Sequence, residues 1–201
     1  MTQTTTETQM ESAAYAAPEP RRWAVALKRR WPTWLAIALA LSTAGDDPDS
    51  RTGLSEALLL FALGYLAAAV LQQRQATWLI ASLAIGALAA LRLQDWADPS
   101  LVLLVAALAL VVWAAVHGQL WPPGAVMFET VGVVGFGAIA LSAMSLDYQL
   151  GGYLLAAGWF AHAAWDFAHY RADKVVTRSF AEWCAVFDAL GAVGILIVTM
   201  R

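Results

Sequence analysis

The stretch TWLIASLAIGALAALRLQDWADPSLVLLVAALALVVWAAVH, residues 77–117, decides the fold class. It contains two apolar runs, 77–93 and 100–117, separated by the polar segment DWADPS at 95–100. Each run is close to the roughly 17–25 residues that a helix needs to cross a bilayer. Asp and Pro are typical of the turn between two helices. The stretch therefore predicts a pair of transmembrane helices joined by a short turn.

The composition of the whole chain agrees with this prediction. Of the 201 residues, 60% are hydrophobic and 13% are charged, and the mean hydropathy is +0.60. Soluble domains have about 25% charged and about 45–50% apolar residues, so a membrane protein is the better interpretation. The net charge of −3 provides no basic face for nucleic acid. The chain has one cysteine, Cys184, which excludes an internal disulfide.

Apolar segments of similar length occur on both sides of this stretch. Together with it they make seven: 31–45, 54–71, 77–93, 100–117, 124–143, 149–168 and 180–200. We expect an all-α polytopic membrane bundle of seven transmembrane helices over residues 21–201, preceded by a disordered polar tail at 1–20. The first segment is short. It either extends back through WAVALKRR (23–30) or follows an interfacial amphipathic helix at 20–31.

Charge in the loops predicts the orientation. Basic residues gather before the first segment, at Arg74, and between the sixth and seventh segments, whereas the alternate connections are acidic. Because short basic loops stay cytoplasmic, we expect the N-terminus inside and the C-terminus outside a plasma membrane. If the first segment does not span, the N-terminus lies outside instead. Tryptophans near most segment ends fit the aromatic belt at the headgroup level.

Five ionisable residues inside the last three segments point to a functional site. A charged group at mid-bilayer costs on the order of 2.5–3.5 kcal/mol on insertion scales, so such residues usually have a role. His162, Asp166 and His169 are spaced i, i+4 and i+7 and share one face of the sixth segment. Counting ~1.5 Å per residue from the cytoplasmic ends places Glu129, His162 and Asp188 at about one depth.

This combination of residue types favours a metal site. We predict that His162, Asp166 and Asp188 bind a metal, for which zinc or iron is suitable. A bound metal would activate water, and Glu129 or His169 would then be the general base. The motif H-E-x-x-H is absent, so no named metal motif supports the assignment.

The same residues also have interpretations that involve packing only. His162 pairs with Asp166 or with Glu129 to satisfy buried polar groups. His169 stabilises a helix C-terminus, where a cation suits the dipole. Cys184 is a small buried hydrophobic residue.

Four residues near segment ends have local structural interpretations. Ser179 and Glu182 form a capping box that opens the seventh segment. Ser100 is the N-cap of the fourth segment. Arg92 closes the third segment and reaches the outer headgroups.

The pattern H162-x-x-W165-D166-x-x-H169, followed by C184-x-x-x-D188, resembles one in small uncharacterised bacterial multi-pass membrane proteins. This resemblance covers about the last 45 residues. It implies a bacterial inner membrane and no particular reaction. A looser likeness connects the chain to seven-helix metal hydrolases such as alkaline ceramidases and adiponectin receptors, which use His and Asp on membrane helices. The paired histidines and the serine of those proteins have no counterpart here.

Three functions remain open at this point. The first is an intramembrane site for a metal or a small-molecule or lipid-like ligand, with hydrolytic chemistry as one option. The second is proton-coupled transport of a small solute, for which the outer half offers Glu56, Ser142, Ser145 and Asp147. The third is a structural or accessory subunit whose polar cluster fixes helix packing.

Overall fold

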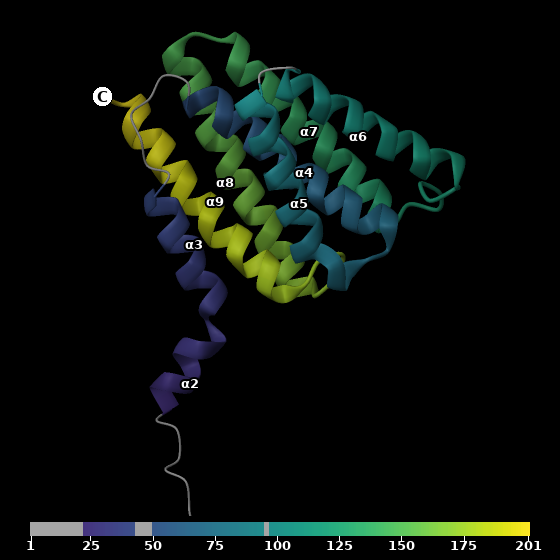
Figure 1. Ribbon diagram of the computed structural model, residues 1–201, viewed down its shortest axis with the longest axis horizontal. Helices are drawn as coiled ribbons and strands as arrows, with labels where there is room; N and C mark the ends of the chain where they lie inside the picture. Colours follow the sequence, from purple (N-terminus) through teal and green to yellow (C-terminus); the bar gives the residue numbers. More distant parts are fainter. Residues whose placement is uncertain (1–21, 43–49, 95–96) are drawn as a thin grey trace, which may run out of the picture. The chain divides into compact units, whose positions relative to one another are not determined.

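The computed structural model describes residues 22–42, 50–94 and 97–201, and the predicted tail at 1–20 lies outside them. Apart from turns, these residues are helical. The elements are α2 (Arg22–Arg29), α3 (Trp31–Ser42), α4 (Ser50–Leu71), the 3-10 turn η1 (Arg74–Ala76), α5 (Thr77–Gln94), α6 (Pro99–Val116), α7 (Ala125–Ser145), α8 (Tyr148–Ala172) and α9 (Arg178–Thr199). Figure 1 shows their course. The all-α prediction is confirmed.

The chain divides into two units between Trp31 and Pro32. The described part of the first unit is essentially α2, a short amphipathic helix with Lys28 and Arg29 in its last turn. Its helix ends before Arg30, whose N–H bonds to the Leu27 carbonyl at 3.1 Å. Residues 22–42 therefore form two helices rather than one extended helix. The second unit contains the bundle.

Five helical stretches in the described residues are long and apolar enough to cross a membrane. They are Arg51–Leu71, Arg74–Gln94, Pro99–Val116, Ala125–Ser145 and Arg178–Thr199, with mean hydropathies from 1.8 to 2.5. Helix α8 is long enough, at 25 residues or ~37 Å, but its His, Asp and Gln side chains make it less apolar. Helix α3 has 12 residues, or ~18 Å, which is short of a ~30 Å hydrocarbon core.

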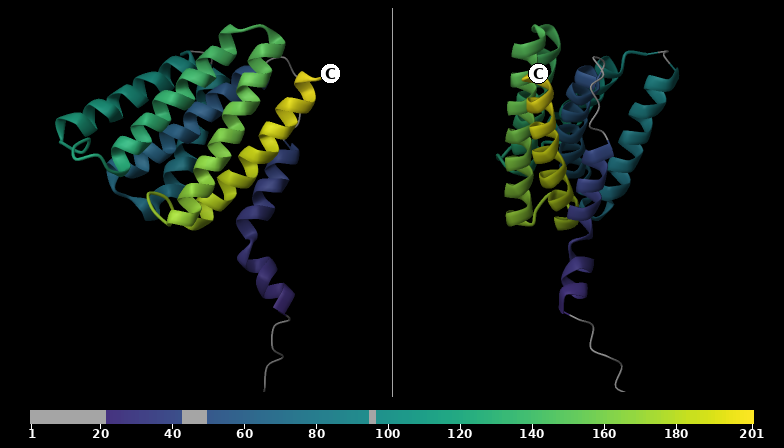
Figure 2. Two further views of the ribbon diagram at one scale, coloured as in Figure 1. Left: turned by 180° about the vertical axis from the view of Figure 1, so that it is seen from behind. Right: turned by 90° about the vertical axis from the view of Figure 1, so that its left-hand side faces the viewer.

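Helix α4 is the centre of the bundle. It packs against α5, α6, α7 and α8, and its residues from Leu58 to Leu63 are all buried. The most extensive helix pair is α8 with α9, which lie side by side in each view of Figure 2. Close approach there depends on small residues, because a Cβ atom at Gly152 would collide with the Thr199 side chain.

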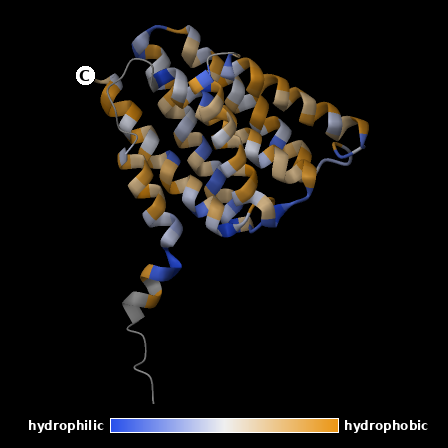
Figure 3. Cartoon of the chain, viewed as in Figure 1, coloured by the Kyte–Doolittle hydropathy of each residue, from blue (hydrophilic) through white to orange (hydrophobic). Residues whose placement is uncertain are grey.

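The outward faces of α5 and α6 are apolar. Leu83 and Leu108 are each more than 60% exposed, and Figure 3 shows hydrophobic residues along most of α6, with hydrophilic ones at the turn between α4 and α5. Continuous exposed apolar surface is rare on soluble monomers. Lipid is the solvent that suits these faces, so the structure agrees with a membrane protein.

The structure differs from the predictions for two polar residues near helix ends, Ser100 and Arg92. Asp98, not Ser100, caps α6 by accepting from the Leu101 N–H at 3.0 Å, with Pro99 as the first helical residue. Ser100 donates instead to Glu56 at 3.1 Å. Arg92 also bonds to buried Glu56, through Nε at 2.9 Å and Nη2 at 2.7 Å, rather than extending to headgroups.

The predicted capping box of α9 is also wrong. Thr177 is the N-cap residue, and no side-chain cap bond forms there, so Ser179 lies inside the first turn. Glu182 accepts a hydrogen bond from Thr33 at 2.6 Å. Its carboxylate thus connects α9 to α3.

Candidate functional site

The structure brings His162, Asp166 and Asp188 together. All three side chains are completely buried. Nδ1 of His162 lies 2.7 Å from Asp188 Oδ2 and 3.4 Å from Asp166 Oδ2. Each residue offers one possible ligand atom, and these atoms all lie within 4.8 Å of one another. We call these three residues the inner cluster.

Two features of the sequence position the inner cluster. His162 and Asp166 are one turn apart on α8, so their side chains share one face. Asp188 comes from α9, which approaches α8 closely because glycines lie at the contact; Gly191 leaves room for the Trp159 ring. The predicted equal depth of His162 and Asp188 agrees with their hydrogen bond.

Several polar atoms of the inner cluster have no partner. Among the described residues, no hydrogen bond is made by His162 Nε2, by either oxygen of Asp166, or by Asp188 Oδ1. A buried carboxylate without a partner is costly, because neither water nor a counter-charge replaces its lost hydration. One imidazole beside two carboxylates leaves the group short of positive charge or of protons.

Aromatic rings enclose His162. The ring centroids of Phe136 and Tyr65 lie 4.7 Å and 5.8 Å from that of His162, both edge-to-face. The ring of Phe61 is tilted relative to the imidazole, with 6.4 Å between the centroids. Phe61 in turn contacts Trp183 and Phe187, which stack on each other at 5.3 Å. Trp183 and Phe187 therefore form an outer aromatic layer around the inner cluster.

Tyr65 is a site residue that sequence reasoning missed. It is fully buried in α4 and interacts electrostatically with Asp166, Cys184 and Asp188. Its ring also lies 4.8 Å from that of His169, so it connects the inner cluster to the next group. The available signal was a hydroxyl in the middle of an otherwise apolar segment, FALGYLAAAV (61–70).

Glu129 pairs with His169, and not with His162 as one interpretation predicted. Oε1 of Glu129 lies 2.7 Å from Nε2 of His169, and Oε2 accepts the indole N–H of Trp165 at 3.2 Å. Nδ1 of His169 lies 2.9 Å from the Trp165 carbonyl oxygen. His169 is 5% exposed and so is not at the surface of the bundle. We call Glu129 and His169 the outer pair.

A cavity of about 360 Å³ adjoins the outer pair. Its lining residues come from the start of α7, the end of α8 and the loop after it: Gly124, Ala125, Phe128, Glu129, Ala168, His169, Ala172, Lys174 and Val175. Most of these side chains are apolar, and Lys174 is the one lysine among them. The outer pair, and not the inner cluster, lines the cavity.

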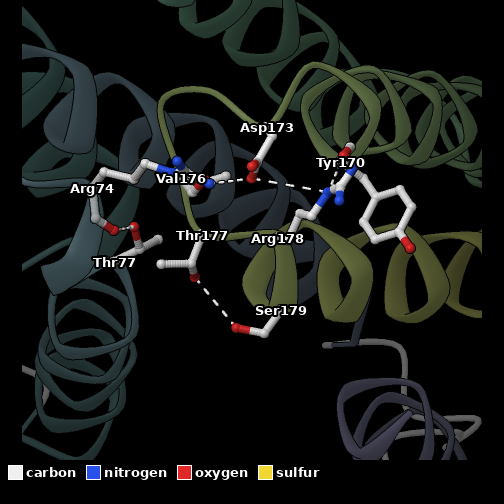
Figure 4. A network of polar contacts seen from close by, with 8 residues as sticks. All are labelled: Arg74, Thr77, Tyr170, Asp173, Val176, Thr177, Arg178 and Ser179. Atoms are coloured by element: carbon white, nitrogen blue, oxygen red, sulfur yellow. Dashed lines mark hydrogen bonds and ion pairs between the residues drawn. The ribbon is translucent and has the colours of Figure 1, made fainter. Parts of the chain in front are cut away.

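The loop that bounds this cavity is held by a polar network, shown in Figure 4. Arg74, from the turn before α5, donates to the Val176 carbonyl at 2.9 Å and pairs with Asp173. Asp173 ends α8 in the left-handed conformation, with φ of 53°. Val175 has φ of 67°, which is strained for a β-branched residue. Arg74 therefore helps to fix the edge of the cavity.

Cys184 is fully buried and lies near Asp166 and Asp188, but it does not belong to the inner cluster. This agrees with its interpretation as a small buried residue.

Comparisons with protein-family models, with curated proteins and with solved structures found no match to this chain.

Proposed function

We propose that this chain is a multi-pass membrane protein whose inner cluster of His162, Asp166 and Asp188 binds a divalent metal ion, zinc or iron. The observation that carries the proposal is Asp166, whose two buried oxygens have no hydrogen-bond partner in the described structure. A cation would supply the missing counter-charge, and oxygens of both aspartates would be its ligands.

The ligand chemistry supports a metal. One imidazole and two carboxylates form a three-ligand set, and catalytic zinc sites keep three protein ligands and one open position. The aromatic enclosure by Phe61, Tyr65 and Phe136 keeps water away and orients the imidazole. When bound, such an ion acts as a Lewis acid on an oxygen of a substrate.

The membrane setting is proposed with it. We infer seven spans, adding α3 and α8 to the five apolar helices, with the N-terminus in the cytoplasm of a bacterial inner membrane. Helix α8 buries its polar residues His162, Asp166 and His169 on the side that packs against α4, α7 and α9, so the membrane-spanning helix that we propose does not present them to lipid. On this topology both the inner cluster and the cavity lie in the cytoplasmic half.

A through-path for transport has less support. Glu56, the acidic residue that such a path needs in the outer half, is bound by Arg92 and Ser100. Asp147 caps α8, and Ser145 donates to the Ser142 carbonyl. The cavity beside the outer pair, and not the enclosed inner cluster, is the place that suits a small-molecule or lipid-like ligand, and hydrolysis of such a ligand is proposed in analogy to seven-helix metal hydrolases.

Metal content tests the proposal. Full-length protein is purified in detergent without added metal, and bound elements are measured by mass spectrometry beside Asp166→Asn and Asp188→Asn. Asp173→Asn is the matched control, because Asp173 is an aspartate at the end of α8 outside the cluster. We expect near-stoichiometric zinc or iron in wild type and control, and at least a tenfold loss in both cluster variants.

Two outcomes would count against this proposal. If wild-type protein is metal-free and also fails to take up added zinc or iron, the inner cluster binds no metal. Its remaining interpretations are then a packing cluster or a proton relay. Equal metal in wild type and in both cluster variants places the ion elsewhere. Circular dichroism on each sample establishes that a variant which has lost metal is still helical.

A further inference from the structure

The outer pair and Trp165 form a second polar group, separate from the inner cluster. The protonation of this group bears on the role of Glu129 and His169 in the proposed function, from which its membrane setting is taken. Three hydrogen-bond contacts connect Glu129, His169 and Trp165.

The first step concerns Nδ1 of His169. It lies 2.9 Å from the carbonyl oxygen of Trp165, one turn earlier on α8. A carbonyl oxygen only accepts hydrogen bonds, so Nδ1 must carry a hydrogen and donate it. A neutral imidazole has one N–H, and this bond uses it. Nε2 would then be a bare acceptor.

The second step concerns Nε2 of His169. It lies 2.7 Å from Oε1 of Glu129, which is the short distance of a charge-assisted hydrogen bond. A bare nitrogen and a carboxylate oxygen are both acceptors and would repel each other at this distance. A proton must therefore lie between the two atoms. The pair holds one more proton than a neutral histidine beside a carboxylate would.

The third step decides which atom has that proton. The Trp165 indole N–H donates to the other oxygen of Glu129 at 3.2 Å, and a donor to a carboxylate favours its ionised form. The proton then lies on His169, which forms an imidazolium–carboxylate ion pair.

Trp165 is itself held firmly in place. Its ring stacks on Phe128 at 4.0 Å with 7° between the planes and meets Phe136 edge-on at 5.7 Å. A Cβ atom at Gly132 would lie 2.9 Å from the indole, so glycine there leaves space for the ring. The indole N–H and the main-chain carbonyl of one residue thus fix both members of the pair.

We propose that Trp165 is a positioning residue that locks Glu129 and His169 into an ion pair holding a proton beside the cavity. Both members of the pair line that cavity, together with Lys174. A ligand with an oxygen or nitrogen acceptor would therefore meet an acid there. Resting His169 is then a proton donor and not the general base that its residue type alone indicates.

The chain contains its own reference for this geometry. His117 has the same bond to the carbonyl of a tryptophan one turn earlier, with Nδ1 at 2.8 Å from the Trp113 oxygen, and its ring stacks on Trp113 at 4.2 Å. Both residues are exposed, and none of the described carboxylates forms an ion pair with His117. The two histidines thus differ at Nε2, which contacts the Glu129 carboxylate in His169 and no described carboxylate in His117.

The test is nitrogen NMR of ¹⁵N-histidine-labelled full-length protein in detergent, at about pH 8, where an unperturbed histidine is neutral. We expect His169 to have both nitrogens protonated and His117 to have a bare Nε2. Signals are assigned with His117→Gln and His169→Gln. In Trp165→Phe, which keeps an aromatic ring but loses the indole N–H, the ratio of protonated to neutral His169 should fall about tenfold.

Glu129→Gln should leave His169 neutral, and Trp113→Phe should leave it unchanged as the matched control. A bare Nε2 on His169 in wild type would overturn the proposal, and so would a Trp165→Phe spectrum identical to wild type. Because the readout needs no metal, measuring bound metal on the same samples separates failure of this proposal from failure of the proposed function. Helicity by circular dichroism identifies any variant that does not fold.

Discussion

At the scale of single residues, Asp166 and Glu129 show two ways of burying a carboxylate. Glu129 has a hydrogen-bond donor on each oxygen, from His169 and from Trp165. Asp166 lies in an equally buried position without either. Leaving one such group unsatisfied costs more than a typical hydrogen bond contributes. Asp166 has only the more distant Nδ1 of His162, at 3.4 Å, as an ion-pair partner among the described residues, and this difference is the reason for which we propose a cation beside it.

This leads to a prediction about stability. If a metal binds the inner cluster of the folded protein and not the unfolded chain, metal at 100-fold its Kd stabilises by about 2.7 kcal/mol. For a chain of this length that is roughly 5–10 °C in Tm. We expect a chelator to lower the Tm of wild-type protein by this amount and to leave that of Asp166→Asn unchanged.

The measurement is thermal unfolding followed by intrinsic fluorescence in detergent, with and without chelator. Asp173→Asn, whose carboxylate is about half exposed, should respond to the chelator as wild type does. A chelator that leaves wild-type Tm unchanged, in protein shown to contain metal, would mean that the ion does not support the fold.

The sequence predicted in part which residues of the candidate site lie close together, and the wrong pairing of Glu129 has a physical cause. Spacing along α8 predicted that His162 and Asp166 are neighbours, and equal depth agrees with the contact of His162 with Asp188. Depth does not give the rotation of a helix about its axis, and so Glu129 was also matched to His162. In the structure it meets His169, two turns away along α8.

At the scale of elements, the contact between α8 and α9 sets the distance across the inner cluster. His162 and Asp188 come from these two helices, and small residues let the helices approach. The closest such point is Gly152 against Thr199, near the end of α9. Widening the contact there should loosen the bundle.

We expect Gly152→Ala to destabilise the protein by about 1–3 kcal/mol, the usual cost of overpacking. Its Cβ would collide with the Thr199 side chain, so Thr199→Ala in addition should restore part of the loss. Gly135→Ala in α7 is the matched control, since nothing lies within 4 Å of a Cβ there. It should be neutral or stabilising by up to about 1 kcal/mol, because alanine is the better helix former.

Denaturant unfolding in mixed micelles, followed by helicity, measures all four proteins under one condition. If Gly152→Ala were as stable as Gly135→Ala, the two helices would have room to separate without loss. The contact would then have no part in placing Asp188 beside His162.

Elements were easier to predict than their ends. Apolar segments gave α4 to α9 to within a few residues, because burying apolar side chains in lipid requires little besides length. The residue at which a helix begins depends on which of several neighbouring polar residues forms the N-cap hydrogen bond. Both Asp98 and Ser100 suit that position, and Ser100 instead bonds to Glu56 from another helix. A local motif does not reveal such tertiary partners.

At the scale of the whole molecule, the alternation of loops predicts sidedness. In a Cys184→Ala background, single cysteines at Gln75 and His117 report the α4–α5 and α6–α7 connections. Cysteines at Ala97 and Leu146 report the two connections at the other end of the helices. All four positions are exposed. We expect a membrane-impermeant maleimide to label Ala97→Cys and Leu146→Cys in spheroplasts, and the other two only in inverted vesicles.

The N-terminal side then distinguishes seven spans from six. With 12 helical residues in α3, the hydrophobic length favours six, whereas the five basic residues between positions 21 and 30 favour an N-terminus inside and hence seven. We expect Thr5→Cys to be labelled only in inverted vesicles, as Gln75→Cys is, because a basic cluster is retained in the cytoplasm. Labelling of Thr5→Cys in spheroplasts would mean that α3 does not cross the membrane and that the protein has six spans. Labelling of Gln75→Cys and Ala97→Cys from the same side would contradict the spanning of α5 and with it the bundle topology.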